Sequence, residues 1–125
     1  NMTELTKAEE QVMQILWKME RGMVRDILEK FPDPKPAYNT VSTIVRILEK
    51  KEVVAHKAYG KNFEYYPLIS KKDYAKSRFN HVFENYFSGS FPKLATFFAK
   101  DKKMSLKEFD ELMSMIREEV KKENE

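Results

Sequence analysis

The sequence predicts an α+β fold that is mostly α-helical with one small β-hairpin, and two observations carry this prediction. Through most of the 125 residues, apolar side chains recur at spacings of three and four, the period of a helix with one buried face. Residues 53–68 instead alternate and are rich in β-branched and aromatic side chains around residues 59–62 (YGKN), which favours a hairpin. Pro67 limits the second strand of this hairpin to an edge or an end.

The length and composition fit one domain, or one small domain with an appendage. The hydrophobic content of 42%, with 9 Phe and 6 Tyr, is normal for a globular chain with a packed core. No apolar run approaches the roughly 18 residues of a membrane span, and the first residues lack the layout of a signal peptide. We therefore expect a cytoplasmic protein without membrane insertion. The absence of cysteine excludes disulfides, thiolate metal sites and cysteine nucleophiles.

Three helices are expected before the hairpin. The first opens at residues 6–9 (TKAE), which have the form of a capping box. Gly22 interrupts its apolar stripe, and residues 23–31 (MVRDILEKF) indicate a second, shorter helix. The prolines that follow cannot continue this helix, so the third helix lies within residues 36–51 (PAYNTVSTIVRILEKK). Three helices followed by a hairpin is the element order of a winged helix-turn-helix.

We therefore assign residues 1–70 to a winged-helix domain and residues 71–125 to a helical region. Residues 70–73 (SKKD) begin this second region with a looser form of the capping box. Another capping box, residues 105–108 (SLKE), opens its last helix. Helical patterns run through residues 74–87, 91–100 and 106–120.

The third helix carries unusual residues on its outer face. Its apolar side chains recur at i, i+3, i+4 and i+7, so the short polar side chains of its first turns face outward. Such side chains suit the major groove of DNA, because Asn pairs with adenine, Arg with guanine, and a Thr methyl group touches thymine. A recognition helix enters that groove with its first turns against the base edges. The candidate base-reading residues are Asn39, Thr40, Ser42, Thr43 and Arg46.

Cations surround this helix: six Lys and Arg residues stand against two Glu residues between Lys35 and Lys61. Cationic and hydroxyl side chains fix a protein on the phosphate backbone without reading sequence. Two other interpretations remain open, since Asn39 and Thr40 are good helix caps and lysines at a helix C-terminus oppose the helix dipole. The candidate phosphate-binding residues are Lys35, Lys50, Lys51, Tyr59 and Lys61.

The C-terminal helices carry more large aromatic side chains than three helices hide alone, which favours a two-fold dimer. A dimer sets two recognition helices about 34 Å apart, one turn of DNA. The alternative is that the last stripe packs on the helices of its own chain. The candidate dimer-interface residues are Phe91, Leu94, Phe97, Phe98, Leu106, Phe109, Met113 and Ile116.

The sequence offers no catalytic constellation. His56 and His81 are isolated, and no HExxH motif, glycine-rich phosphate loop or GxSxG motif occurs. We therefore expect no enzyme, no metal site and no cofactor. The rival function is a winged-helix module that binds proteins or RNA without operator specificity, in which Tyr65 and Tyr66 stack on bases.

The segments TVSTIVRILEKK and VVAHKAYGKNFEYYPLISKKDY resemble the BlaI/MecI/CopY family of bacterial repressors, which control β-lactamase, penicillin-resistance or copper genes. LTKAEEQVMQILW resembles the opening helix of that family, and GSFPKLATFFAKDKKMSLKEFDELMSMI its C-terminal dimerisation part. The resemblance implies a homodimeric repressor that binds a dyad-symmetric double-stranded DNA operator. Two positions depart from the family pattern. Ile47 stands where the family has Arg, and Glu52 stands where it has Gly, so we expect the third helix to end without the left-handed glycine cap.

The resemblance also implies a mode of induction. Repressors of the β-lactam branch are inactivated through a membrane-bound sensor protease pathway that leads to cleavage at an Asn-Phe bond. The corresponding bond here is Phe97-Phe98, which lacks the Asn. The copper branch senses metal with paired C-terminal cysteines, which this chain does not contain.

Overall fold

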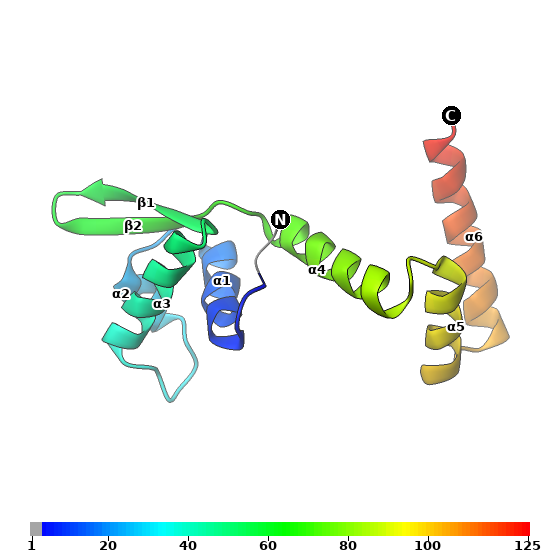
Figure 1. Ribbon diagram of the computed structural model, residues 1–125, viewed down its shortest axis with the longest axis horizontal. Helices are drawn as coiled ribbons and strands as arrows, with labels where there is room; N and C mark the ends of the chain where they lie inside the picture. The colour runs from blue at the N-terminus through cyan, green and yellow to red at the C-terminus, as the bar shows by residue number, and fades with distance from the viewer. Residues whose placement is uncertain (1–3) are drawn as a thin grey trace. The chain divides into compact units, whose positions relative to one another are not determined.

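The computed structural model describes residues 4–125 and confirms the predicted class, with helices and one two-stranded antiparallel sheet (Figure 1). The chain divides into two compact units, one ending at Phe79 and the other comprising Asn80–Glu125. The elements in chain order are α1 (Lys7–Met19), α2 (Val24–Glu29), α3 (Tyr38–Lys50), β1 (Val54–Tyr59), β2 (Asn62–Pro67), α4 (Lys71–Tyr86), α5 (Phe91–Asp101) and α6 (Leu106–Glu123).

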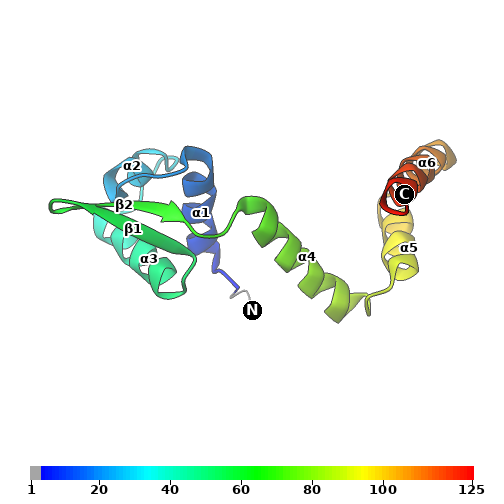
Figure 2. The same cartoon turned by 90° about the horizontal axis from the view of Figure 1, so that it is seen from above.

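The first unit has a closed apolar core. Figure 2 shows α1, α2 and α3 gathered around the hairpin, and all of these elements contribute buried side chains. Burial of each such side chain is worth about 1.5–3 kcal/mol, so this core is the main source of stability in the unit. Its fully buried side chains are Val12, Met13, Leu16, Ile27, Val41, Val45, Leu48 and Val54.

Two of the three predicted capping boxes form in full, whereas the described residues at the start of α4 show one bond alone, from the Asp73 N–H to Ser70 Oγ at 3.0 Å. At the start of α1, the Glu9 N–H donates to Thr6 Oγ1 at 3.2 Å, and the Thr6 N–H donates to Glu9 Oε1 at 2.9 Å. Ser105 and Glu108 exchange the same pair of bonds at the start of α6. These bonds satisfy backbone N–H groups that have no partner inside the helix.

Gly22 does more than interrupt a helical pattern, because it joins the sheet. Its N–H donates to the Tyr65 carbonyl at 3.0 Å, and the Tyr65 N–H donates to its carbonyl at 2.8 Å. A Cβ atom at this position would lie 2.6 Å from Met19 Cε, so a larger residue here would displace the flexible end of that side chain. The turn between α1 and α2 thereby pairs with β2 through one residue and is its second partner after β1.

The end of α3 corrects one expectation. A left-handed cap forms at Glu52, which has φ 64°, although glycine is absent. The Glu52 N–H donates to the Glu49 carbonyl and the Val53 N–H donates to the Leu48 carbonyl, both at 3.0 Å, which is the Schellman pattern. Val53 and Leu48 are both buried in the core, and their burial holds the non-glycine residue in this conformation.

The beginning of α4 belongs to the first unit. Tyr74 is buried, and its hydroxyl oxygen accepts a hydrogen bond from the Leu5 N–H at 3.3 Å. Its ring lies 5.7 Å from that of Trp17, whose Nε1–H donates to the Ile69 carbonyl at 2.8 Å. The segment after the hairpin is therefore fastened to α1, and the sequence pattern had not singled out Tyr74 for this role.

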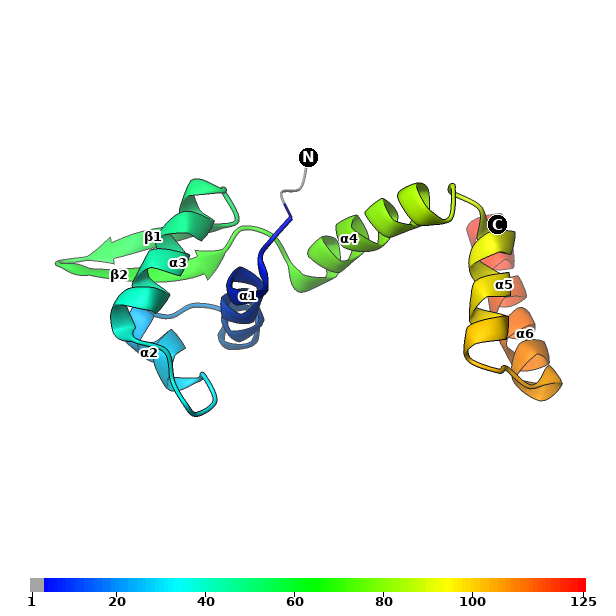
Figure 3. The same ribbon diagram turned by 60° about the horizontal axis from the view of Figure 1, so that its bottom comes forward.

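The second unit is held by aromatic contacts between the end of α4 and α5. Phe83 and Phe91 have ring centroids 4.9 Å apart, and Phe87 and Phe97 have centroids 5.4 Å apart. After the turn that follows Asp101, α6 runs back beside α5 (Figures 1 and 3). Within α5 and α6, both described in full, no side chain is buried. Among residues 4–125, no helix is long and apolar enough to cross a membrane.

Candidate nucleic-acid interface

The candidate interface is the outer face of α3. Val41, Val45 and Leu48 are fully buried, so the opposite side of the helix is turned to solvent. Asn39, Thr40, Thr43 and Arg46 are exposed there, and Ser42 is half-buried. This face of the helix therefore carries short polar side chains, followed by the long cationic side chain of Arg46.

The alternative role of Asn39 and Thr40 as helix caps does not arise. The N-cap of α3 is Ala37, which has no side-chain oxygen, and Asn39 and Thr40 lie inside the first turn. Among the described residues, the side chains of Asn39, Thr40 and Ser42 have no hydrogen-bond partner. Thr43 differs, because its Oγ1 donates to the Asn39 carbonyl at 2.8 Å. The other polar groups are available to a ligand.

Two of the five candidate phosphate-binding residues have partners inside the protein. Lys35 Nζ donates to the carbonyls of Glu29 and Phe31 at 2.9 and 2.7 Å, where it satisfies the C-terminal end of α2. Lys51 Nζ lies 2.7 Å from the Glu9 carboxylate at the start of α1. These two ammonium groups hold α2 and α3 in place.

The Lys51–Glu9 pair is an ion pair with a buried carboxylate. Burial raises the pKa of Glu9, but the hydrogen bonds from Lys51 and Thr6 and the charge of Lys51 outweigh it, and the net pKa lies below its ordinary value. Glu9 also completes the capping box, so one buried carboxylate joins two helices. No local pattern predicted this pair, since the partners are 42 residues apart.

The other three candidate phosphate-binding residues are exposed. Lys50 lies in the last turn of α3, and Tyr59 and Lys61 flank the hairpin tip. In the hairpin, Tyr59 pairs with Asn62, so Gly60 and Lys61 form a two-residue loop. Gly60 has φ 63°, the left-handed conformation that this loop requires. Lys57 Nζ lies over the Tyr59 ring, 5.8 Å from its centroid.

Figure 3 shows α3 crossing one face of the hairpin, and the contacts on that face join the two elements. His56 Nδ1 of β1 lies 2.5 Å from Glu49 Oε2 of α3. Burial raises the pKa of Tyr65, and the Glu49 carboxylate raises it further, against the opposing charge of Arg46. Charged side chains of α3 therefore act on the Tyr65 hydroxyl, and His56 has a partner, which sequence reasoning had not given it.

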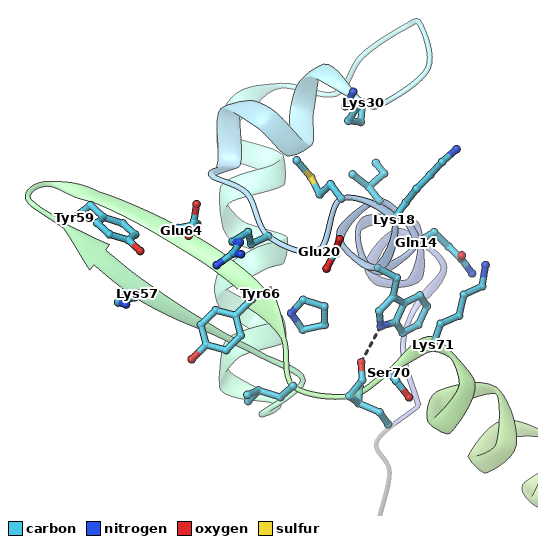
Figure 4. Close-up of a pocket in the computed structure, with 17 residues that line it drawn as sticks. Gln14, Lys18, Glu20, Lys30, Lys57, Tyr59, Glu64, Tyr66, Ser70 and Lys71 are labelled. Carbon is cyan, nitrogen blue, oxygen red and sulfur yellow. Dashed lines mark hydrogen bonds between the residues drawn. The ribbon is translucent and has the colours of Figure 1, made fainter.

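An open groove of about 1450 Å³ lies on the other face of the hairpin (Figure 4). Side chains alternate along a strand, so Lys57 and Tyr66, which line the groove, point away from α3. The end of α1 and residues 67–71 complete the groove. None of the five candidate base-reading residues lines it. The candidate base-reading face of α3 is therefore separate from this groove, although the candidate phosphate-binding residue Tyr59 lines the groove.

The candidate dimer-interface residues lie mostly exposed on α5 and α6. Phe91 is 71% exposed and Leu106 is 83% exposed. Leu94 and Met113 are half-buried, and Phe97, Phe98, Phe109 and Ile116 are exposed. Phe97 and Phe98 have ring centroids 5.8 Å apart. Across residues 4–125, no group of three His, Cys, Asp or Glu side chains is arranged to hold a metal ion.

The comparisons with known proteins agree with this geometry. The family model of the penicillinase repressor matches residues 5–118. The methicillin resistance regulatory protein MecI of Staphylococcus aureus (strain N315) is 26% identical over 114 residues, which cover 90% of this chain and 93% of MecI. The penicillinase repressor of Staphylococcus aureus is 29% identical over 122 residues, which cover 95% of each chain.

A solved structure of a relative also matches this chain. It is the solution structure of the monomeric form of Bacillus licheniformis BlaI in complex with the blaP half-operator, with TM-score 0.50 and 25% identity over 59% of this chain and 92% of that one. The predicted winged helix is thereby confirmed. Because the family model spans most of its length, the chain belongs to the penicillinase repressor family, a family of DNA-binding repressors rather than enzymes.

Proposed function

We propose that this chain is a cytoplasmic transcriptional repressor that binds a dyad-symmetric double-stranded DNA operator as a homodimer. The observation that carries the proposal is the outer face of α3, where the side chains of Asn39 and Thr40 lie exposed and, among the described residues, unpaired on the same side of the helix as the exposed Arg46. The relative BlaI was solved with a half-operator, which supports DNA as the ligand of this chain.

In this proposal α3 reads bases and the hairpin grips the backbone. Asn39 and Arg46 make bidentate contacts with base edges, each worth about 1–3 kcal/mol of discrimination against a wrong base pair. Thr40, Ser42 and Thr43 add contacts from the same face. Lys50, Tyr59 and Lys61 bind phosphates, since their polar ends are exposed. Lys35 and Lys51 contribute mainly by holding α2 and α3.

The second half of the proposal is that residues 71–125 pair two subunits. It is supported by the unburied apolar side chains of α5 and α6, since a large exposed apolar surface marks an interaction site. Pairing also raises affinity for a two-fold operator, because the second head binds at high effective concentration. Phe109→Asp places a charge in this surface and is expected to give monomers in sedimentation. A surviving dimer would exclude the α6 seam.

The proposal is tested by selecting bound duplex fragments from the DNA of the source organism with the purified chain. A repressor enriches a dyad-symmetric sequence with half-sites one helical turn apart. Arg46→Ala should weaken binding to that sequence more than binding to random duplex. If random duplex is bound as well as any selected sequence, the chain is instead an interaction or RNA-binding module.

The substitution Lys61→Ala distinguishes binding to the DNA phosphates from recognition of the bases. Loss of a phosphate contact should lower affinity on every duplex and reduce the salt dependence of binding by about one counterion. Binding constants measured at several salt concentrations provide the check. An unchanged slope would remove the hairpin tip from the interface.

Induction by proteolysis at Phe97-Phe98, through a membrane-bound sensor protease pathway, completes the proposal. It is supported by the exposure of both side chains on α5. Cells exposed to a β-lactam should then contain a fragment that ends at residue 97, detected by mass spectrometry. Replacement of both residues by Ala should leave the chain intact and the target genes silent.

A further inference from the structure

One imidazole fastens the hairpin to the recognition helix. His56, in the middle of β1, pairs through Nδ1 with the Glu49 carboxylate near the end of α3. On its other side, its ring stacks on Phe63 of β2, with centroids 4.2 Å apart, and tilts against Tyr65 at 5.4 Å. His56 thus contacts α3 and two side chains on the same face of β2 from a single position. Contacts of this number fix the orientation of a side chain.

The position of His56 along the hairpin gives the contact its importance. Val54 is buried, Ala55 and His56 are half-buried, and the following residues of β1 are exposed. On β2, burial likewise falls from Tyr65 to the exposed Phe63. His56 therefore marks the place where the hairpin leaves the body of the first unit and begins to project.

The projecting part behaves as a lever. Gly60, at the tip, is four positions along the chain from His56. A strand advances about 3.4 Å per residue, so the projecting part is about 14 Å long. A rotation of about 10° at its base would move the tip by about 2 Å, which is enough to break a hydrogen bond to a phosphate oxygen. A contact at the base therefore controls contacts at the tip.

We propose that Glu49 and His56 are positioning residues, which hold the hairpin at the angle at which Tyr59 and Lys61 reach the DNA backbone. Neither residue touches the nucleic acid in this scheme. The proposal rests on the proposed function, because it assigns these residues a role in DNA binding. The pair is half-buried, with side chains 29% and 33% exposed, so it is partly shielded from screening by salt.

The test is a double-mutant cycle between the base and the tip of the hairpin. Binding of the selected duplex is measured for the full chain and for Glu49→Ala, Lys61→Ala and the double variant. In the unchanged chain, Lys61→Ala should reduce affinity about three- to tenfold at low salt. In the Glu49→Ala background the same substitution should cost less than about twofold, because the tip is no longer held in place.

Glu64→Ala is the matched control. Both Glu64→Ala and Glu49→Ala remove one carboxylate, the first from the hairpin and the second from the neighbouring helix α3. Glu64, however, lines the groove on the face of the hairpin away from α3. The Lys61→Ala loss should keep its full size in this background. His56→Ala removes the other partner and should repeat the result of Glu49→Ala. Thermal unfolding of each variant verifies that the first unit stays folded.

The outcomes separate the two proposals. Additive losses in both the Glu49→Ala and His56→Ala backgrounds overturn the positioning role and leave the repressor function standing. Binding that is insensitive to Lys61→Ala in the unchanged chain also overturns the positioning role, since such a hairpin has nothing to position. If the unchanged chain binds no duplex, the proposed function fails and the positioning role fails with it.

Discussion

The two units of the chain differ in where their large apolar side chains lie. In the first unit, Ile27 and Leu48 are fully buried in a core shared by three helices and a hairpin. In α5 and α6 no side chain is buried, and Ile116, Val120 and Leu106 are between 44% and 83% exposed. The first unit thus closes its core within one chain, whereas α5 and α6 leave apolar side chains exposed to solvent. The predictions below test this difference.

The largest contrast is expected for one substitution made in both units. Ile27→Ala leaves a cavity in the closed core and should lower the free energy of unfolding by about 2–5 kcal/mol. Ile116→Ala removes the same atoms from an exposed position and should cost less than about 1 kcal/mol in the monomer. Denaturant unfolding at a protein concentration where sedimentation shows monomers measures both. Equal losses would mean that α6 has a closed core of its own.

Neighbouring lysines at the end of α3 should separate folding from binding. Lys51→Met leaves the buried Glu9 carboxylate without its ammonium partner and should lower the free energy of unfolding by about 1–3 kcal/mol. Lys50→Met, at an exposed position, should change it by less than about 0.5 kcal/mol and instead weaken DNA binding. Thermal unfolding and binding titrations of the two variants provide the comparison. The reverse pattern would contradict the assignment of Lys51 to the fold.

Acid should weaken the first unit through Glu9. Because its pKa is lower in the folded state than in the unfolded state, its stabilisation is complete above the unfolded value of about 4.3 and is lost as the pH falls through the folded value. Glu9→Gln keeps an N3 side chain that suits a capping box but cannot ionise. The stability difference between wild type and Glu9→Gln should therefore shrink below about pH 4. Unfolding curves between pH 3 and 7 test this, and a constant difference would exclude the linkage.

The smallest effect is expected at the end of α3. Glu52→Gly removes the cost of a left-handed conformation in a residue with a side chain and should raise the free energy of unfolding by about 0.5–1 kcal/mol. Lys103→Gly makes the same change at φ 52° in the turn before α6. It should not alter the unfolding of the first unit. A loss of stability on Glu52→Gly would show that the glutamate has a favourable role in the cap.

Much of the fold followed from local patterns in the sequence. The capping boxes at Thr6 and Ser105, the hairpin around Gly60 and the buried stripe of α3 each depend on residues close together in the chain. Such features are predictable because helix periodicity and turn chemistry act over a few residues. The exposed polar face of α3 followed from the same periodicity.

The contacts that hold these elements together could not be predicted from local sequence patterns. Lys51 and Glu9, Trp17 and Ile69, and Leu5 and Tyr74 are pairs separated by 42, 52 and 69 residues. Nothing local marks one lysine of the Lys50–Lys51 pair as the partner of a buried carboxylate. The left-handed cap at Glu52 was missed because packing of Val53 and Leu48 overrides the local preference for glycine.

The contact of Tyr74 with α1 determines what cleavage of the chain in α5 would do. The contacts that hold the first unit together lie within the part of the chain that ends at Phe79. They include the hydrogen bond from the Leu5 N–H to the Tyr74 hydroxyl. If the chain is the proposed dimer, a cut in α5 would therefore separate a folded first unit from the part of the chain that pairs two subunits. The released first unit would then dissociate from its target because avidity is lost, without unfolding.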